Sequence, residues 1–394
     1  MRAYFAPCGI GLGHVSRCVS ILHKLREEED VKAIFATYAE GLNYARELGL
    51  RTYAIPELKY AMKPWGEIDV ERTLMDPGLK VIDIISRQAA HDLKGMLALR
   101  PDIVISDTRA VALLAAASLG IPSICILNQF RAYVPRRKRL LRLSKLADAG
   151  FLAIMGSIWS LAHHIFVPDY PDPFTICRGN IEVPEYFRKK LRLVGPILAR
   201  RPEELPSQEE LKEELGFEEG KPLIFVSASG TKEERAYFVK MMVRLLSCLK
   251  NEFQAVISLS EPHKGERVLK HDGGLRVFYW VEDYLAYLKA CDIAILRGGH
   301  SSIMQCMAYG KPMLLVPTPS HTEKMMNALR AREVGVAKVL LQRELELRKL
   351  KEALGDLLED KRYRRAVRKA YKMASNLNAV GEIVKAVKEL AGSG

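Results

Sequence analysis

Two glycine-rich stretches of this chain could expose backbone amides to an anion. One stretch, Gly9-Ile-Gly11-Leu-Gly13, stands directly before His14, and the other is Arg297-Gly298-Gly299. A glycine turn between a buried strand and a helix leaves free N–H groups at the positive end of the helix, where phosphate binds well. The second stretch also fits an ordinary helix start, because Ser302-Ile-Met-Gln305 has the spacing of a capping box.

His14 and Asp107 are the side chains best suited to take a proton from a hydroxyl group. An imidazole accepts a proton near neutral pH. Asp107 follows an apolar run at 102–106, and the carboxyl end of such a strand usually faces a ligand. Asp107 is therefore a competing base, a residue that orients His14 or the acceptor hydroxyl, or a cap of the next helix. Asn128 and Gln129 end the next strand and could contact acceptor hydroxyls.

The chain shows no sequence motif for a metal or a dinucleotide. It contains no Asp-x-Asp, and its seven cysteines form no C-x-x-C pair. We expect reduced core cysteines of a cytosolic protein, without disulfides or zinc. The first turn has the spacing G-x-G-x-G, whereas the dinucleotide fingerprint is G-x-G-x-x-G. This difference argues against an NAD site. A diphosphate would then be stabilised by helix N-termini and by Arg297, without a metal ion.

These residues need strand–turn–helix units to position them, and the hydrophobic pattern predicts such units throughout. The expected helices include 16–26, 79–99, 108–119, 233–249, 281–290, 301–308 and 379–390. The expected strands are 2–7, 31–37, 51–55, 102–106, 123–127, 165–168, 191–194, 223–227, 254–259, 275–280, 293–296 and 313–316.

The length of 394 residues and the polar, proline-containing segment 200–221 indicate more than one domain. The prediction is an α/β protein of two facing Rossmann-like domains with a ligand cleft between them. We place the N-terminal, acceptor-binding domain at 1–195 and the C-terminal domain at 196–375. A final helix within 376–394 is expected to pack back towards the N-terminal domain.

The formal net charge of +13 indicates an anionic partner, which could be nucleic acid, lipid headgroups or a phosphorylated substrate. We expect no nucleic acid, because no basic groove is interleaved with aromatic residues. We also expect no signal peptide and no membrane span, because the apolar runs 110–127 and 149–162 are broken or short. Basic residues at 136–145 precede apolar ones up to 159. This segment is either a surface for an anionic membrane or a solvated charge run before a core helix.

The segment 290–328 resembles the nucleotide-sugar signature of two-domain (GT-B) glycosyltransferases. It contains Arg-Gly-Gly-x-x-Ser-x-x-Gln, then Ala-x-Gly-x-Pro, Val-Pro and Glu-x-x-x-Asn-Ala. The pattern is similar to family 28, the N-acetylglucosaminyltransferases of lipid-linked peptidoglycan precursor synthesis and their relatives. It spans nearly 40 residues with several fixed spacings, which makes it far more specific than a single glycine turn.

The resemblance implies a UDP-sugar-dependent hexosyltransferase with no cofactor beyond the donor substrate. Its implied acceptor residues are Gly11, Gly13, Asn128 and Gln129, and His14 occupies the histidine position of the acceptor turn. The implied nucleotide-sugar residues are Ser229, Gly230, Val281, Arg297, Gly298, Gly299, Ser301, Ser302, Gln305, Glu323 and Lys324. The chain departs from the pattern at Gln305, where glutamate usually holds the ribose, and at Lys324, which is often glutamine.

We therefore expect a metal-independent, inverting transfer of N-acetylglucosamine from its UDP donor to a hydroxyl of a lipid-linked or glycan acceptor. We expect the protein to be cytoplasmic. If the acceptor is a lipid, we expect it to act at the cytoplasmic face of the membrane. One alternative is a UDP-sugar 2-epimerase of the same fold, with acid and base groups from Glu261, His263 and His321. Another is a non-catalytic subunit that only binds the nucleotide sugar.

Overall fold

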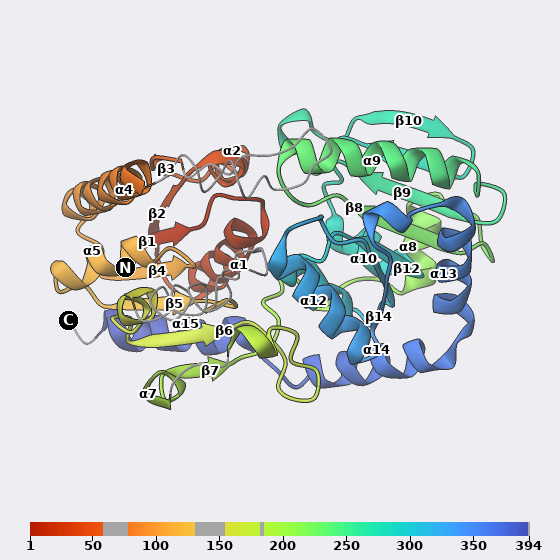
Figure 1. Cartoon of the computed structure of the whole chain (residues 1–394). Coiled ribbons are helices and arrows are strands. Elements are labelled where there is room, and N and C mark those ends of the chain that lie inside the picture. The colour runs from red at the N-terminus through yellow and green to blue at the C-terminus, as the bar shows by residue number, and fades with distance from the viewer. Residues whose placement is uncertain (58–77, 131–153, 182–184, 393–394) are drawn as a thin grey trace, which may run out of the picture.

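The computed structural model of the chain describes residues 1–57, 78–130, 154–181 and 185–392. Two lobes lie side by side, each built around one sheet, and the C-terminal helix returns to the first lobe (Figure 1). The strands of the first sheet are β1 (Arg2–Pro7), β2 (Lys32–Thr37), β3 (Thr52–Ala54), β4 (Ile103–Asp107), β5 (Ser123–Ile126), β6 (His164–Val167) and β7 (Leu191–Leu193).

The first sheet is parallel throughout, in the order β3-β2-β1-β4-β5-β6-β7. Successive β1 side chains point to opposite faces, and both faces are buried, as is usual for a parallel sheet. Phe5 packs with α1 (Gly13–Glu28) and α15 (Ala379–Ala391). Tyr4 packs on the other face with residues of α4 (Gly78–Leu99) and α5 (Ala110–Ser118). The remaining helices here are α2 (Ala39–Glu47) and α7 (Glu185–Arg188).

The second sheet has the order β10-β11-β9-β8-β12-β13-β14 and is parallel except at its edge strand β10. Its strands are β8 (Leu223–Ser227), β9 (Gln254–Ser258), β10 (Val268–Asp272), β11 (Leu275–Phe278), β12 (Ile293–Leu296), β13 (Met313–Leu315) and β14 (Ala337–Val339). Its helices are α8 (Gln208–Glu214), α9 (Lys232–Ser247), α10 (Tyr284–Ala290), α11 (His300–Ala308), α12 (Thr322–Glu333), α13 (Leu347–Glu359) and α14 (Lys361–Ala374). These two Rossmann-like sheets confirm the predicted fold class.

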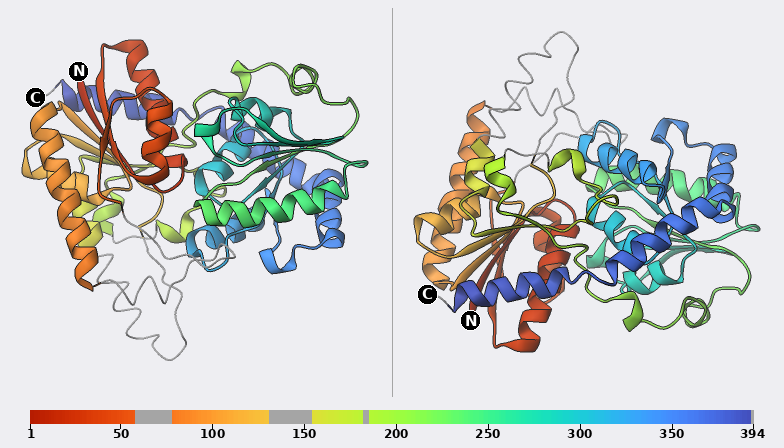
Figure 2. Two further views of the ribbon diagram at one scale, coloured as in Figure 1. Left: turned by 90° about the horizontal axis from the view of Figure 1, so that it is seen from above. Right: turned by 90° about the horizontal axis from the view of Figure 1, so that it is seen from below.

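The chain passes between the two lobes twice. The first passage follows β7, and the predicted domain boundary at 195 lies between β7 and β8. The second passage runs from α14, on the second lobe, directly into α15, which lies along the first lobe (Figure 2). Ile383, Val384 and Val387 of α15 are buried in the core that contains β1 and α1. The first lobe thus takes part of its core from the last residues of the chain.

Several predicted boundaries were wrong. The helix α1 begins at Gly13, three residues before the expected start. The helix α11 begins at His300 behind the N-cap Gly299, without a side-chain cap, so neither Ser301 nor Ser302 caps it. The edge strand β10 was not predicted, because its side chains are mostly exposed and therefore lack an apolar run.

The basic and apolar segment of the sequence analysis falls largely on 131–153, outside the described residues. Residues 154–159 of this segment lie in the described part. Trp159 is buried against Phe130, with ring centroids 5.5 Å apart, and Ile154 is 66% exposed. In the part of the chain that the structure describes, no helix is long and apolar enough to cross a membrane. All seven cysteines are free thiols, and five of them are buried.

The docking of α15 gives a prediction about stability. Ile383→Ala should lower the free energy of unfolding of the first lobe by about 2–5 kcal/mol, because it leaves a cavity in a buried core. Lys385→Ala on the same helix is the control, since that side chain is 78% exposed and its loss should change stability by less than about 0.5 kcal/mol. Urea unfolding of both variants provides the measurement. Equal small effects would show that α15 does not stabilise the first lobe.

Candidate active site between the two domains

The structure brings together the two candidate bases of the sequence analysis. His14 is the second residue of α1, and Asp107 is the last residue of β4, the strand beside β1. His14 Nδ1 lies 2.7 Å from Asp107 Oδ1. The Asp107 side chain is fully buried, whereas that of His14 is 25% exposed. Only the imidazole is therefore accessible to a substrate.

Arg17 completes this group and was missed by the sequence analysis. It lies one helical turn after His14, and its Nε and Nη2 atoms donate to the two oxygens of Asp107 at 2.8 and 2.6 Å. Burial alone would raise the pKa of Asp107, but the charges of Arg17 and His14 outweigh it and lower the pKa. Asp107 is therefore ionised at neutral pH and can only accept hydrogen bonds. A proton on His14 Nδ1 makes the contact with Asp107 a hydrogen bond, although Arg17 Nη2 also lies 2.9 Å from this nitrogen. In this tautomer Nε2 is the nitrogen that can accept a proton.

The two glycine turns face each other across the domain interface. Gly13 begins α1, and a Cβ atom built on it would lie 3.1 Å from Ser301 Oγ in the first turn of α11. Gly11, in the same turn as Gly13, has φ +71°, a backbone conformation that favours glycine. The N-termini of the two helices are thus in contact distance, and both lobes line one site.

Asn128 and Glu323 form a second contact between the lobes. Asn128 Nδ2 donates to Glu323 Oε1 at 3.1 Å, and Gln129 follows it half-buried. Glu323 is in the first turn of α12, whose N-cap is His321. Burial would raise the pKa of Glu323, but His321, His300 and His14 lower it. A carboxylate predicted to contact the sugar therefore lies near the predicted base of the other domain.

The turn after β12 has the shape expected of an anion site. Gly298 has φ +83°, and its carbonyl accepts a hydrogen bond from Asn327 Nδ2 at 3.3 Å. Ser229, in the turn after β8, faces this turn, because its Oγ lies 3.7 Å from a Cβ built on Gly299. Gly230 beside it has φ +119°. Both turns end adjacent parallel strands, so their amides lie at one edge of the sheet.

Arg297 and Lys324 lie behind and beside these turns. The Arg297 side chain is fully buried and donates to Gln342 Oε1 at 2.8 Å and Thr318 Oγ1 at 2.9 Å. Lys324 Nζ pairs with Glu234 Oε2 at 3.0 Å. The predicted contact of Arg297 with a diphosphate is therefore not a direct surface contact in this structure, and its charge acts from beneath the turn.

The other predicted donor residues lie on the same side of the second domain. Val281 is fully buried behind β11. Ser302 is half-buried in the first turn of α11, and Gln305 is half-buried in its second turn. Beside Val281, the Trp280 ring lies 5.9 Å from the ring of Tyr44 in α2 of the first domain. The interface thus continues from the two glycine turns to the predicted position of the nucleotide base.

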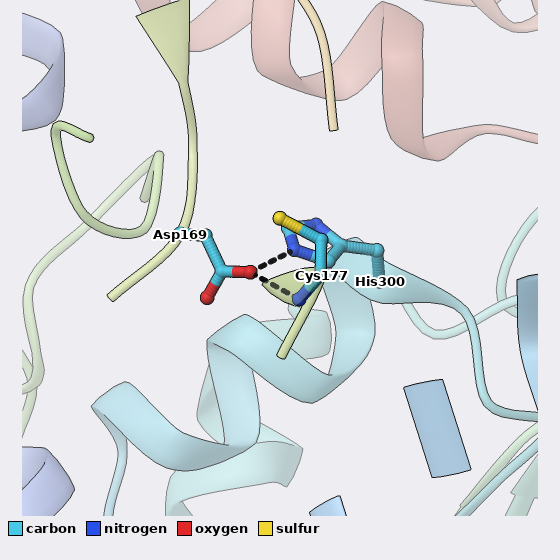
Figure 3. Close-up of side chains that lie close together, drawn as sticks. All are labelled: Asp169, Cys177 and His300. Atoms are coloured by element: carbon cyan, nitrogen blue, oxygen red, sulfur yellow. Dashed lines mark hydrogen bonds and ion pairs between the residues drawn. The ribbon is translucent and has the colours of Figure 1, made fainter. Parts of the chain in front are cut away.

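A third contact between the lobes joins Asp169, Cys177 and His300, whose potential ligand atoms lie within 4.8 Å of one another (Figure 3). Asp169 Oδ2 accepts from the Cys177 amide at 2.7 Å and lies 3.0 Å from His300 Nε2. The amides of Tyr170 and Ile176 donate to the same carboxylate. Sequence spacing could not reveal this cluster, because His300 is 131 residues from Asp169 and lies in the other lobe. Its carboxylate is already surrounded by donors, so it holds His300 at the start of α11.

Glu261, His263 and His321 were considered as acid and base groups of an epimerase, and they belong to two different elements of the second domain. Glu261 pairs with Lys264 at 2.7 Å, beside His263 in the short helix η4 (Pro262–Lys264). His321 caps α12, where burial and the charge of Lys324 lower its pKa to about 4. His321 is therefore uncharged at neutral pH.

Comparisons with known proteins identify this two-domain protein as a glycosyltransferase. Residues 223–387 match the model of the glycosyltransferase family 28 C-terminal domain. The family resemblance seen in the sequence is confirmed.

Relatives and solved structures match along the whole chain. An uncharacterized glycosyltransferase of Methanosarcina mazei is 28% identical, with 99% of this chain and 97% of the relative covered. The UDP-N-acetylglucosamine–N-acetylmuramyl-(pentapeptide) pyrophosphoryl-undecaprenol N-acetylglucosamine transferase of Caldanaerobacter subterraneus is 26% identical, with coverages of 99% and 100%. The structure of glycosyltransferase SsfS6 of Streptomyces sp. SF2575 with thymidine diphosphate has a TM-score of 0.64, 19% identity and 99% coverage of both chains.

The lowered pKa of Asp107 predicts a specific dependence of stability on pH. The unfolded chain titrates this carboxyl near pH 4, above its value in the folded protein. Its contribution to stability is therefore present above about pH 4 and is lost as the pH falls through the folded-state value. The stability difference between wild type and Asp107→Asn should shrink below about pH 4, measured by urea unfolding at a series of pH values. If the stability difference between the two proteins stayed constant with pH, Asp107 would not be an ionised, stabilising carboxylate.

Proposed function

We propose that this glycosyltransferase moves N-acetylglucosamine from its UDP donor to a hydroxyl of a lipid-linked or glycan acceptor. The observation that carries the proposal is the approach of the His14–Asp107 pair to the N-terminus of α11. A base on one side and an anion site on the other are the two parts that glycosyl transfer needs. Support for the donor comes from the relative named for UDP-N-acetylglucosamine and from the similar fold that binds thymidine diphosphate.

His14 is the general base in the proposed reaction. Its Nε2 accepts the proton of the acceptor hydroxyl while the hydroxyl oxygen bonds to the anomeric carbon of the sugar. The bond between that carbon and the diphosphate oxygen breaks, and its electron pair leaves with UDP. A single direct displacement inverts the configuration at this carbon. The proton then passes from His14 to solvent.

Asp107 serves as the residue that orients His14. It is fully buried and bonded to Arg17, so it cannot reach an acceptor hydroxyl. Its charge stabilises the imidazolium that forms as the proton is taken. Asn128 and Gln129 lie on the acceptor side of the site, while Glu323 contacts hydroxyls of the donor sugar from the other domain.

The leaving UDP is stabilised by groups of the chain in this proposal, without a metal ion. The amides from Gly298 to Ser302 surround the positive end of α11. Ser229 and Gly230 contribute from the neighbouring turn, and Val281 marks where main-chain groups receive the base. Preorganised donors of this kind stabilise a developing charge without reorganisation during the reaction.

The same relative supports the proposed kind of acceptor. Its name specifies a pyrophosphoryl-undecaprenol acceptor, which is a lipid. We propose a related lipid-linked acceptor here, used at the cytoplasmic face of an anionic membrane. The net charge of +13 favours such a surface electrostatically.

A transfer assay tests the function. The protein is incubated with labelled UDP-N-acetylglucosamine, with and without membrane lipid extract, and with EDTA in parallel. We expect label in the lipid fraction only when the extract is present, at a rate that EDTA does not change. Isomerised UDP-sugar without transfer would identify an epimerase instead, and binding without either reaction would identify a non-catalytic subunit.

The roles of His14 and Asp107 give a second prediction. His14→Ala should lower kcat by about 10²–10⁴-fold, the usual contribution of a positioned base. Asp107→Asn should also lower kcat and leave the donor KM unchanged, because Asp107 contacts the base and no donor group. His23→Ala is the matched control, since His23 is an exposed histidine of the same helix. Turnover of His14→Ala within about 10-fold of wild type would exclude His14 as the base.

A further inference from the structure

Lys324 packs against the two turns that were assigned to the donor diphosphate, with its ammonium at one turn and its backbone at the other. Lys324 Nζ is 3.1 Å from the Cβ position of Gly230, in the turn after β8. The backbone oxygen of Lys324 is 2.6 Å from the Cβ position of Gly298, in the turn after β12. A Cβ atom at Gly298 would collide with the Lys324 backbone, and one at Gly230 would collide with Oε2 of Glu234, the carboxylate that pairs with Lys324. The lysine is therefore packed against both turns.

Buried partners hold the ammonium in this place. Lys324 Nζ lies 3.0 Å from Glu234 Oε2 and 3.2 Å from Thr318 Oγ1, and the residue is 8% exposed. Glu234 is also fixed, because the amide of Thr231 donates to the same oxygen at 2.9 Å. Burial lowers the pKa of Lys324, and the charge of Glu234 opposes that shift. The long side chain thus has a defined position before any donor binds.

Arg297 has no carboxylate within hydrogen-bonding distance among the residues that the structure describes, whereas Lys324 has Glu234. Glu234 and Glu323 are the carboxylates that act on the charge of Lys324. Arg297 is fully buried, its hydrogen-bond partners Gln342 and Thr318 are neutral, and its Nε atom has no partner among the residues that the structure describes. Burial lowers the pKa of Arg297 to about 10, so it remains charged at neutral pH. A buried guanidinium without a bonded carboxylate is stabilised when an anion binds near it.

We propose that Lys324 binds the diphosphate of the donor and neutralises the leaving UDP, and that Glu234 holds its ammonium in position beforehand. This inference rests on the proposed function and adds a residue to it. The resembling enzymes often have glutamine at this position of the signature. This chain has Lys324 there, and Lys324 packs against the turns after β8 and β12. As the anomeric bond breaks, one further negative charge develops on UDP. The ammonium offsets this charge without transferring a proton.

Binding of UDP, without sugar or acceptor, tests this inference by titration calorimetry. Lys324→Gln should weaken UDP binding by about 10–100-fold, the effect of losing one hydrogen bond between charged groups. The affinity for uridine, which has no phosphate, should not change. Lys324→Arg should restore part of the UDP affinity. Lys311→Gln is the matched control, because Lys311 is also buried in this domain but bonds to Gln208.

Loss of Lys324 alone leaves Glu234 buried without its cation, which could prevent folding. The double variant Glu234→Gln with Lys324→Gln removes both charges and is expected to fold, as circular dichroism would verify. Its UDP affinity should be as low as that of the single variant. Wild-type UDP affinity in a folded variant without Lys324 would overturn the inference and leave the function intact. No binding of UDP by the wild type would instead overturn the proposed function.

Discussion

The convergence of three helix N-termini on one interface is the constraint on which the site depends. The helices α1, α11 and α12 begin there, and each helix presents the positive end of its dipole. Such ends repel one another unless negative charge lies between them. Three carboxylates supply it: Asp107 beside α1, Asp169 beside α11 and Glu323 in the first turn of α12. Each is held ionised by a histidine or arginine in contact or nearby, and the pKa of each is lowered.

This arrangement explains why the buried carboxylates are bound to protein groups rather than left free for a substrate. An ionised carboxylate in a buried place is stable only with several donors around it. Asp107 therefore binds Arg17 and His14, and Asp169 binds backbone amides and His300. The consequence for chemistry is a division of roles. The acids set the orientation of the histidines, and the histidines are the groups that can face a ligand.

Much of the fold was predictable because buried parallel strands are continuous apolar runs. The expected strands at 2–7, 223–227 and 293–296 match β1, β8 and β12. His14 and Asp107 could be proposed as one site, because adjacent parallel strands end at the same edge of a sheet. Arg17 and Glu234 could not, because each acts through a partner that is distant in sequence and known only after folding. The signature placed Lys324 among the nucleotide-sugar residues, but it could not indicate the direction of its side chain.

The contact between Asp169 and His300 links the position of the first domain to the donor turn. His300 follows the glycine pair directly, so its imidazole is attached to the backbone that carries the anion-binding amides. The carboxylate that holds it belongs to the other domain and is fixed by its own loop. A shift of one lobe against the other must therefore break this pair, move the start of α11, or move the loop at Asp169. The shape of the donor site and the approach of His14 to it are thus set by the same interface, which is completed only when both lobes are in contact.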